Sequence, residues 1–115
     1  MDFRDTLTPG DIVVLSVAGA VEVKRRPVVV LSGGEYHREH PDVVVGFITT
    51  RVGEATTSAD HVLQDWTDAG LMQPSAFRAY LVTRWRRDIT RYVGRLSQRD
   101  WEAVRQCVRR ALELD

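Results

Sequence analysis

A short cationic segment, KRRP at residues 24–27, stands directly before an apolar run, VVVL at residues 28–31. An arginine carries a planar fork of donors that matches a phosphate group, so the segment could hold a phosphodiester. In an extended chain alternate side chains share a face, which groups Lys24 with Arg26 and turns Arg25 to the other side. From the pattern alone, a solvated strand entrance whose cations pair with nearby carboxylates is the better explanation.

Thr49 is a candidate functional residue because we expect it near the end of a second apolar run, Val43–Thr50. If the strands that contain Arg26 and Thr49 are antiparallel neighbours, the start of one lies beside the end of the other. A hydroxyl beside a guanidinium can orient or protonate a phosphate ester while the guanidinium stabilises negative charge. The two residues together are compatible with phosphoryl transfer, although β propensity alone also explains a threonine here.

A second basic segment, RWRRDITR at residues 84–91, interleaves arginines with a tryptophan. Aromatic rings stack on bases and arginines neutralise phosphates, a combination that suits single-stranded nucleic acid. Arg84 and Arg86 are therefore candidate contacts for a single-stranded nucleic acid. A charged hairpin tip that only keeps the protein in solution explains the segment equally well.

The histidines and the single cysteine offer little chemistry of their own. His37 and His40 lie three residues apart in a polar stretch, and no cluster of Cys or His completes a metal site, so we expect two surface histidines and no metal. His61 could act as a general base near neutral pH, although a structural role is favoured. Cys107 lies in a helical pattern and is expected to be a small core residue.

Length and composition indicate one domain, residues 1–115, with an ordinary apolar content of 43%. No apolar run approaches the roughly 18 residues of a membrane helix, and the N-terminal residues lack the pattern of a signal peptide. The lone cysteine excludes an internal disulfide and predicts a cytoplasmic protein. Residues 1–70 carry six basic and 11 acidic groups, against ten and five in residues 71–115. A chain polarised in this way can present a basic face despite a net charge of zero.

Turn residues divide the chain into short strands followed by one helix, which indicates the α+β class. We expect strands at Ile12–Ser16, Pro27–Leu31, Val43–Thr50, His61–Gln64, Ser75–Thr83 and Ile89–Leu96. We expect a hairpin-like loop at Val17–Val23, polar loops at 32–42 and 51–60, and one helical turn at Asp65–Gly70. Gly46 inside the third strand indicates a bulge or a close backbone approach.

The final helix is predicted to open at Ser97, where a serine followed three residues later by Asp100 forms a variant capping box. It is expected to run to about Glu113 and to bury one apolar stripe. The predicted stripe consists of Trp101, Val104, Val108, Ala111 and Leu112.

Several motifs occur in a recognisable order: Gly10–Val13, Lys24–Ser32, Phe47–Thr50, Ala69–Leu71, Pro74-Ser75 with Arg78, and Gly94–Ser97. In this order they resemble the MazF/PemK toxins of bacterial type II toxin–antitoxin modules. The most specific matches are the Arg-Pro step at 26–27, the Ile-Thr step at 48–49 and the GRLS sequence before the final helix. The resemblance spans nearly the whole chain, from about residue 9 to the C-terminus.

The resemblance implies a small SH3-like antiparallel β-barrel with a C-terminal α-helix, a homodimer and a cognate antitoxin as partner. It implies a metal-independent, sequence-specific endoribonuclease that acts on single-stranded RNA without a cofactor. Arg26 and Thr49 would be the catalytic pair for attack of the 2′-hydroxyl, which yields a 2′,3′-cyclic phosphate, with Arg26 stabilising charge and shuttling a proton. Ser75 and Arg78 match a segment that often contacts RNA, and Lys24 is the expected phosphate contact beside Arg26.

Two features depart from the family pattern. The segment Val17–Val23 has no glutamine where many members have a Gly/Gln-rich loop, and Tyr80 stands where some members have an acidic residue. The identity of the general base is therefore open, with Arg26 as one candidate. Two other functions also stay open: a non-catalytic SH3-like module that binds a peptide or nucleic acid, and a toxin directed at gyrase.

Overall fold

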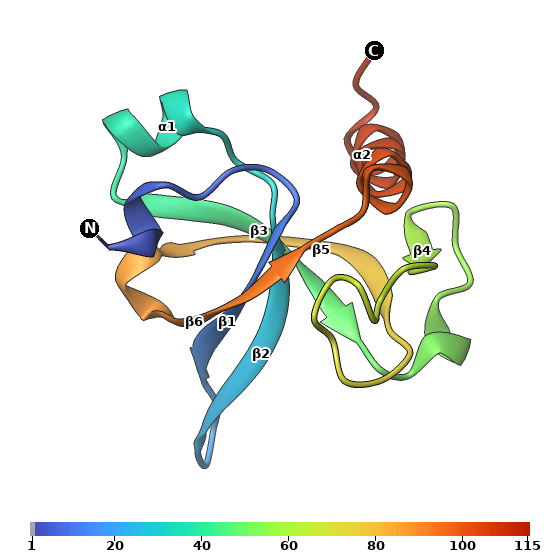
Figure 1. Ribbon diagram of the computed structural model, residues 1–115, viewed down its shortest axis with the longest axis horizontal. Helices are drawn as coiled ribbons and strands as arrows, with labels where there is room; N and C mark the ends of the chain where they lie inside the picture. The colour runs from blue at the N-terminus through green and yellow to red at the C-terminus, as the bar shows by residue number, and fades with distance from the viewer. Residues whose placement is uncertain (1) are drawn as a thin grey trace.

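An antiparallel sheet of six strands forms the centre of the molecule in the computed structural model, which describes residues 2–115 (Figure 1). The strands are β1 (Asp11–Ala18), β2 (Val23–Val30), β3 (Asp42–Thr49), β4 (Asp60–Val62), β5 (Ala76–Trp85) and β6 (Ile89–Arg95). The helices are α1 (Gly34–Glu39) and α2 (Gln98–Leu112), and three short 3₁₀ turns are η1 (Phe3–Asp5), η2 (Val52–Glu54) and η3 (Arg86–Asp88). These elements confirm the α+β class with a C-terminal helix.

The strands lie in the order β4-β5-β3-β2-β1-β6, which leaves β4 and β6 as edges. A closed barrel requires its two edge strands to pair, and within residues 2–115 β4 and β6 do not. The expected barrel is therefore an open, twisted sheet. Register shifts in the β1–β6 and β3–β5 pairings bend it.

At the centre of the sheet both faces are buried, where β1, β2 and β3 carry continuous apolar runs rather than alternating ones. On one face Ile12, Val29 and Phe77 pack with Val104 and Cys107 of α2. The other face has its own cluster, which consists of Leu7, Val13, Leu15, Val28, Val30, Val43, Val45 and Ile89. None of the helices within residues 2–115 has the length and apolar character needed to cross a bilayer.

The start of α2 follows the capping prediction. The Ser97 side-chain oxygen accepts a hydrogen bond from the backbone N–H of Asp100 at 3.3 Å. Cys107 is buried, as predicted. The predicted apolar stripe is wrong in its last turn, where Ala111 and Leu112 are exposed because the helix there has passed beyond the sheet that it covers.

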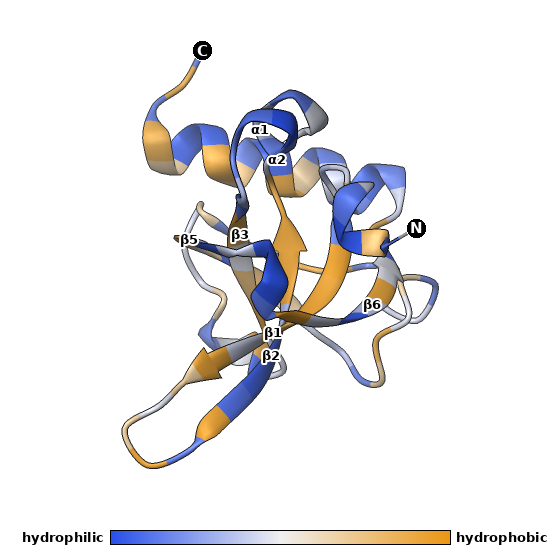
Figure 2. Ribbon diagram, turned by 90° about the vertical axis from the view of Figure 1, so that its left-hand side faces the viewer, coloured by the Kyte–Doolittle hydropathy of each residue, from blue (hydrophilic) through white to orange (hydrophobic). Residues whose placement is uncertain are grey.

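The second strand begins four residues earlier than predicted, at Val23 instead of Pro27, and only residues 19–22 form the hairpin turn. β1 and β2 thus extend together as an arm away from the body of the molecule (Figures 1 and 2). Pro27 lies inside the strand and pairs with Val14 of β1. A proline is tolerated there because β2 pairs with β3 only from Val28 onward, so that Pro27 lies where β2 has become an edge.

The loop predicted for residues 32–42 is wrong, because residues 34–39 form α1. The surface position predicted for His40 is confirmed, but His37 is buried, with its Nε2 atom 2.7 Å from the Ser32 hydroxyl. Burial and the nearby Arg86 guanidinium lower the pKa of His37, against a smaller opposing contribution from the Leu7 backbone. His37 is therefore a neutral packing residue between α1 and the sheet.

Gly46 confirms the predicted bulge, and the group that approaches it closely is a side-chain ring instead of another backbone segment. A Cβ atom at this position would overlap the ring of Phe77. The register of β3 with β5 also shifts here, since Gly46 lies opposite Leu81 whereas the next residue, Phe47, lies opposite Arg78. Bulges of this kind redirect side chains, and this one lies beside the pocket described next.

Candidate active site

Arg26 and Thr49 line the same pocket, which has a volume of about 330 Å³. The β2–β3 register pairs Val28 with Phe47 at its last rung, and the same register continued by two residues sets Arg26 opposite Thr49. The expectation that the two strands are antiparallel neighbours is therefore confirmed. The pocket is lined by Arg26, Phe47, Ile48, Thr49, Glu54, Arg78 and Tyr80.

Among residues 2–115 the Thr49 hydroxyl has one hydrogen-bond partner. Its oxygen accepts a hydrogen bond from the backbone N–H of Arg51 at 3.1 Å. A hydroxyl that accepts such a bond retains its own proton for donation. Thr49 can therefore donate to an oxygen of a phosphate placed in the pocket.

Arg78 brings a second guanidinium into the pocket from β5. Its Nε atom lies 3.4 Å from Asp60 Oδ1, its Nη1 atom lies 3.9 Å from Glu54 Oε1, and its guanidinium carbon lies 4.7 Å from the centre of the Tyr80 ring. The side chain is 21% exposed, so these contacts hold most of it in place. Arg26 and Arg78 together give the pocket the donors that a phosphodiester requires.

Asp60 is the buried carboxylate that holds Arg78. Its side chain is 4% exposed and accepts hydrogen bonds from the backbone N–H and the hydroxyl of Thr57 at 3.1 and 2.9 Å. Burial pushes the pKa of Asp60 up, but the Thr57 hydrogen bonds and the Arg78 guanidinium outweigh it and hold that pKa below its ordinary value. Asp60 therefore carries the negative charge that holds the Arg78 guanidinium in place.

Arg25 faces away from this pocket, as the alternation along β2 predicts. It lines a separate hollow of about 610 Å³ on the other side of the strand, together with Ser75 and Arg91. Ser75 is 2% exposed and donates its hydroxyl to the carbonyl oxygen of Gln73 at 2.8 Å. The structure thus brings Arg78, but not Ser75, to the Arg26–Thr49 pocket.

The other expected RNA contacts lie outside the pocket. Lys24 is exposed on the β1–β2 arm, opposite Val17. Arg84 lies opposite Val43, at the end of the β3–β5 pairing away from Thr49, and donates to the Thr83 carbonyl at 3.2 Å. Arg86 donates to the carbonyl oxygens of His40 and Asp42 at 2.6 and 3.2 Å, and so ties η3 to the start of β3.

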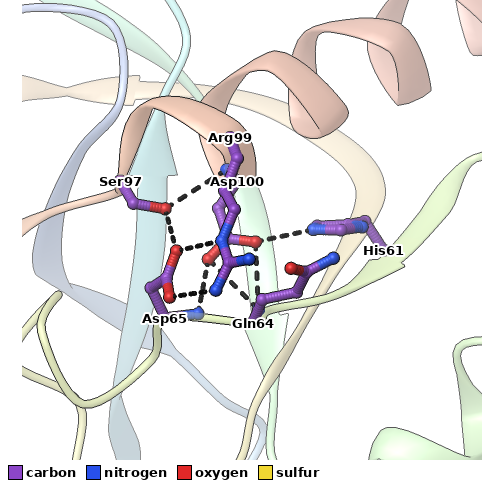
Figure 3. Close-up of polar contacts among 6 residues, drawn as sticks. All are labelled: His61, Gln64, Asp65, Ser97, Arg99 and Asp100. Carbon is purple, nitrogen blue, oxygen red and sulfur yellow. Dashed lines mark hydrogen bonds and ion pairs between the residues drawn. The ribbon is translucent and has the colours of Figure 1, made fainter.

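His61 has the structural role that was favoured for it. Its Nε2 atom lies 2.8 Å from Asp100 Oδ1 at the start of α2 (Figure 3). Asp100 is buried and also accepts hydrogen bonds from the backbone N–H groups of Gln64 and Asp65. Burial raises the pKa of Asp100, but these hydrogen bonds, led by that from Gln64, and the His61 contact hold it below its ordinary value.

Glu54 of the pocket lining and Asp60, which holds Arg78 from outside it, are the acidic residues of the site that the sequence did not predict. Both come from the segment 51–60, which has no apolar periodicity, and only the chain's return to the sheet edge brings them near β5. Within residues 2–115 no group of three or more His, Cys, Asp or Glu side chains could hold a metal ion.

Comparison with known families matches residues 8–112 to the family described as PemK-like, MazF-like toxin of type II toxin–antitoxin system. No curated protein matches the chain significantly. The solved structures that share the fold include a mycobacterial endoribonuclease in complex with its cognate antitoxin, with a TM-score of 0.78 and 16% identity over 95% of this chain and 97% of that one.

Two further structures are similar to this one. The Mycobacterium tuberculosis toxin MazF-mt6 has a TM-score of 0.75 and 24% identity, over 91% of this chain and 98% of that one. A MazE–MazF structure from Deinococcus radiodurans has a TM-score of 0.75 and 17% identity, over 95% and 97%. At these identities the likeness concerns the fold.

Proposed function

The chain belongs to the PemK-like, MazF-like toxins of type II toxin–antitoxin systems, and we propose that it is a sequence-specific endoribonuclease that cleaves single-stranded RNA without a metal ion. The observation that supports this most directly is the placement of Arg26 and Thr49 in one pocket across the β2–β3 pair. A guanidinium and a hydroxyl that line one pocket from neighbouring strands suit the stabilisation of a phosphodiester during cleavage.

The proposed reaction is attack of a ribose 2′-hydroxyl on the adjacent phosphorus. The bond from the 2′-oxygen to phosphorus forms, the bond from phosphorus to the 5′-oxygen breaks, and the products carry a 2′,3′-cyclic phosphate and a 5′-hydroxyl. Arg26 stabilises the negative charge that develops on the phosphate oxygens, and Thr49 donates a hydrogen bond that orients the phosphate. Arg78, held by Asp60, is a further cation for the same group.

The RNA extends beyond the pocket in this proposal. Lys24, two residues from Arg26 on the exposed arm, contacts a neighbouring phosphate, and Ser75, Arg84 and Arg86 remain proposed contacts farther along the RNA. We also propose that the protein forms a homodimer, binds a cognate antitoxin and is located in the cytoplasm. Similar solved structures that include an antitoxin support the antitoxin as partner.

The test is cleavage of a long RNA by the purified protein in EDTA, with the ends mapped. We expect discrete cuts, 2′,3′-cyclic phosphate termini, and no cut where a single 2′-deoxynucleotide replaces the attacking ribose. Arg26→Ala should lower the cleavage rate by about 100-fold or more, since it removes charge stabilisation in the transition state. Arg25→Ala is the matched control, because Arg25 precedes Arg26 but lines the opposite hollow.

The results of this test also distinguish RNA cleavage from the two other candidate functions. RNA that is bound but stays whole would indicate a binding module. Inhibition of supercoiling without RNA cleavage would indicate a toxin directed at gyrase. Full activity in a folded Arg26→Ala variant would contradict the assignment of the site.

A further inference from the structure

The Arg26–Thr49 pocket requires a group that can take a proton from the 2′-hydroxyl. A guanidinium does not lose its proton in a protein, so neither Arg26 nor Arg78 can be that group. At neutral pH a threonine hydroxyl and a tyrosine phenol are protonated and act as donors. Among the side chains that line the pocket, the carboxylate of Glu54 is the remaining candidate.

We infer that Glu54 is the general base of the RNA cleavage proposed above, an inference that rests on that function. Glu54 is the last residue of η2, the turn that follows β3, and its backbone N–H donates to the carbonyl oxygen of Arg51 at 3.0 Å. The turn therefore returns the chain toward the pocket a few residues after Thr49, which places the base and the hydroxyl on one continuous segment.

The contacts of the Glu54 carboxylate leave it able to accept a proton. Its Oε1 atom lies 3.9 Å from Arg78 Nη1 and its Oε2 atom lies 3.8 Å from Arg51 Nη1, and both distances exceed those of hydrogen bonds. The side chain is 52% exposed. The two cations thus keep the carboxylate near the pocket while its lone pairs stay available to a substrate hydroxyl.

Asp60 shows the opposite arrangement in the same region. Its carboxylate is 4% exposed, and the Thr57 backbone and hydroxyl together with Arg78 occupy its oxygens. It is also absent from the pocket lining. Of the two carboxylates that contact Arg78, Glu54 is the one with access to a substrate.

Several charged and titratable groups surround Glu54. Arg26 lies on β2, Arg51 precedes η2, and Arg78 and Tyr80 lie on β5, with Asp60 of β4 beyond Arg78. A bound phosphate would contact the arginines and leave Glu54 beside the ribose.

The proton balance of the step is complete. Glu54 takes the 2′-hydroxyl proton as the bond from the 2′-oxygen to phosphorus forms. The 5′-oxygen leaves with the electron pair of its bond to phosphorus and takes a proton from water at the open side of the pocket. Glu54 then returns its proton to the solvent. Arg26 keeps its proton throughout, so Glu54 has the proton-transfer role that the family resemblance implies for Arg26.

The test measures single-turnover cleavage of a labelled RNA that contains a mapped site, between about pH 3 and pH 8, a range that includes the ordinary titration of a glutamate. The acidic limb of such a profile reports protonation of the base. We expect Glu54→Gln to lower the rate by about 100-fold or more, in line with the contribution of general bases. We also expect it to lose the acidic limb and to bind the RNA as the parent does. Glu54→Asp, which keeps a carboxylate, should retain the limb at a reduced rate.

The matched control is Glu102→Gln, which removes an exposed carboxylate that also contacts an arginine, on α2 away from the pocket. It should cleave as the parent does. A folded Glu54→Gln that keeps the parent rate would overturn the inference, and so would one that is slower yet keeps the acidic limb, since Glu54 would then act only by positioning Arg78. If the parent cleaves no RNA, the proposed function itself fails, which is a different result.

Discussion

Arg26 on β2 and Thr49 on β3 lie opposite each other along the continued register of two antiparallel strands, and they meet at the pocket where that pairing ends. Their separation is therefore set by backbone pairing rather than by a flexible loop. A slip of one residue would turn Arg26 to the other face of the strand and bring Arg25 into its place.

Arg26→Lys should be a severe change although it keeps the charge. An ammonium group lacks the planar fork that holds two phosphate oxygens at once. We expect the single-turnover cleavage rate to fall by about 10-fold or more while the melting temperature stays within a few degrees of the parent. A lysine variant with the parent rate would show that only the charge matters.

Thr49 offers a matched pair of substitutions. Thr49→Val keeps the shape and removes the hydroxyl, whereas Thr49→Ser keeps the hydroxyl. We expect the valine variant to lose roughly 10-fold or more in rate, as for loss of one preorganised donor, and the serine variant to stay close to the parent. Equal rates in the two variants would exclude a chemical role for the hydroxyl.

Tyr80 is expected to act through its ring. Because the Arg78 guanidinium lies 4.7 Å from the ring centre, Tyr80→Phe should preserve the position of Arg78, and Tyr80→Ala should not. We predict that cleavage survives the first change and decreases several-fold in the second. A large loss in Tyr80→Phe would instead assign the phenol a part in proton transfer.

Gly46→Ala should destabilise the fold by about 1–3 kcal/mol, because the added methyl group would overlap the Phe77 ring in a buried site. Gly53→Ala is the control, since a Cβ atom there would meet nothing within 4 Å. Urea unfolding of the two variants and the parent measures the difference. Equal midpoints for all three would show that the ring moves freely.

Stability should fall in acid through Asp100. The pKa of this carboxyl is lower in the folded protein than its ordinary value. The folded state therefore binds this proton less readily than the unfolded chain. The stability that Asp100 contributes is fully present above about pH 4 and is lost as the pH falls through the lower folded pKa.

Asp100→Asn tests the same contact at neutral pH. It should cost about 1–3 kcal/mol, because the backbone donors of Gln64 and Asp65 lose an acceptor oxygen. It should also flatten the acid side of the stability curve. Unfolding followed from about pH 7 to pH 3 in the parent and the variant measures both effects, and parallel curves would assign the acid sensitivity to other groups.

The neighbouring strands of Arg26 and Thr49 could be predicted because each strand is a long β-branched run with a turn signal after it. The positions of Arg84 and Arg86 could not, since they depend on how far β5 continues past the pocket, and β5 is two residues longer at its end than its alternation indicates. Glu54 and Asp60 belong to a segment that lacks periodicity, so only tertiary structure places them. The short α1 was missed for a related reason, because six residues carry too little pattern for a helix.

Asp100 ties the final helix to the strand that contains Asp60. It contacts His61 of β4 and the backbone N–H of Gln64 just after that strand, and Asp60 of the same strand contacts Arg78. Asp100 follows every strand in the chain. A nascent chain can therefore pair Arg26 with Thr49 before Asp100 emerges from the ribosome, and the contact between β4 and the final helix forms last.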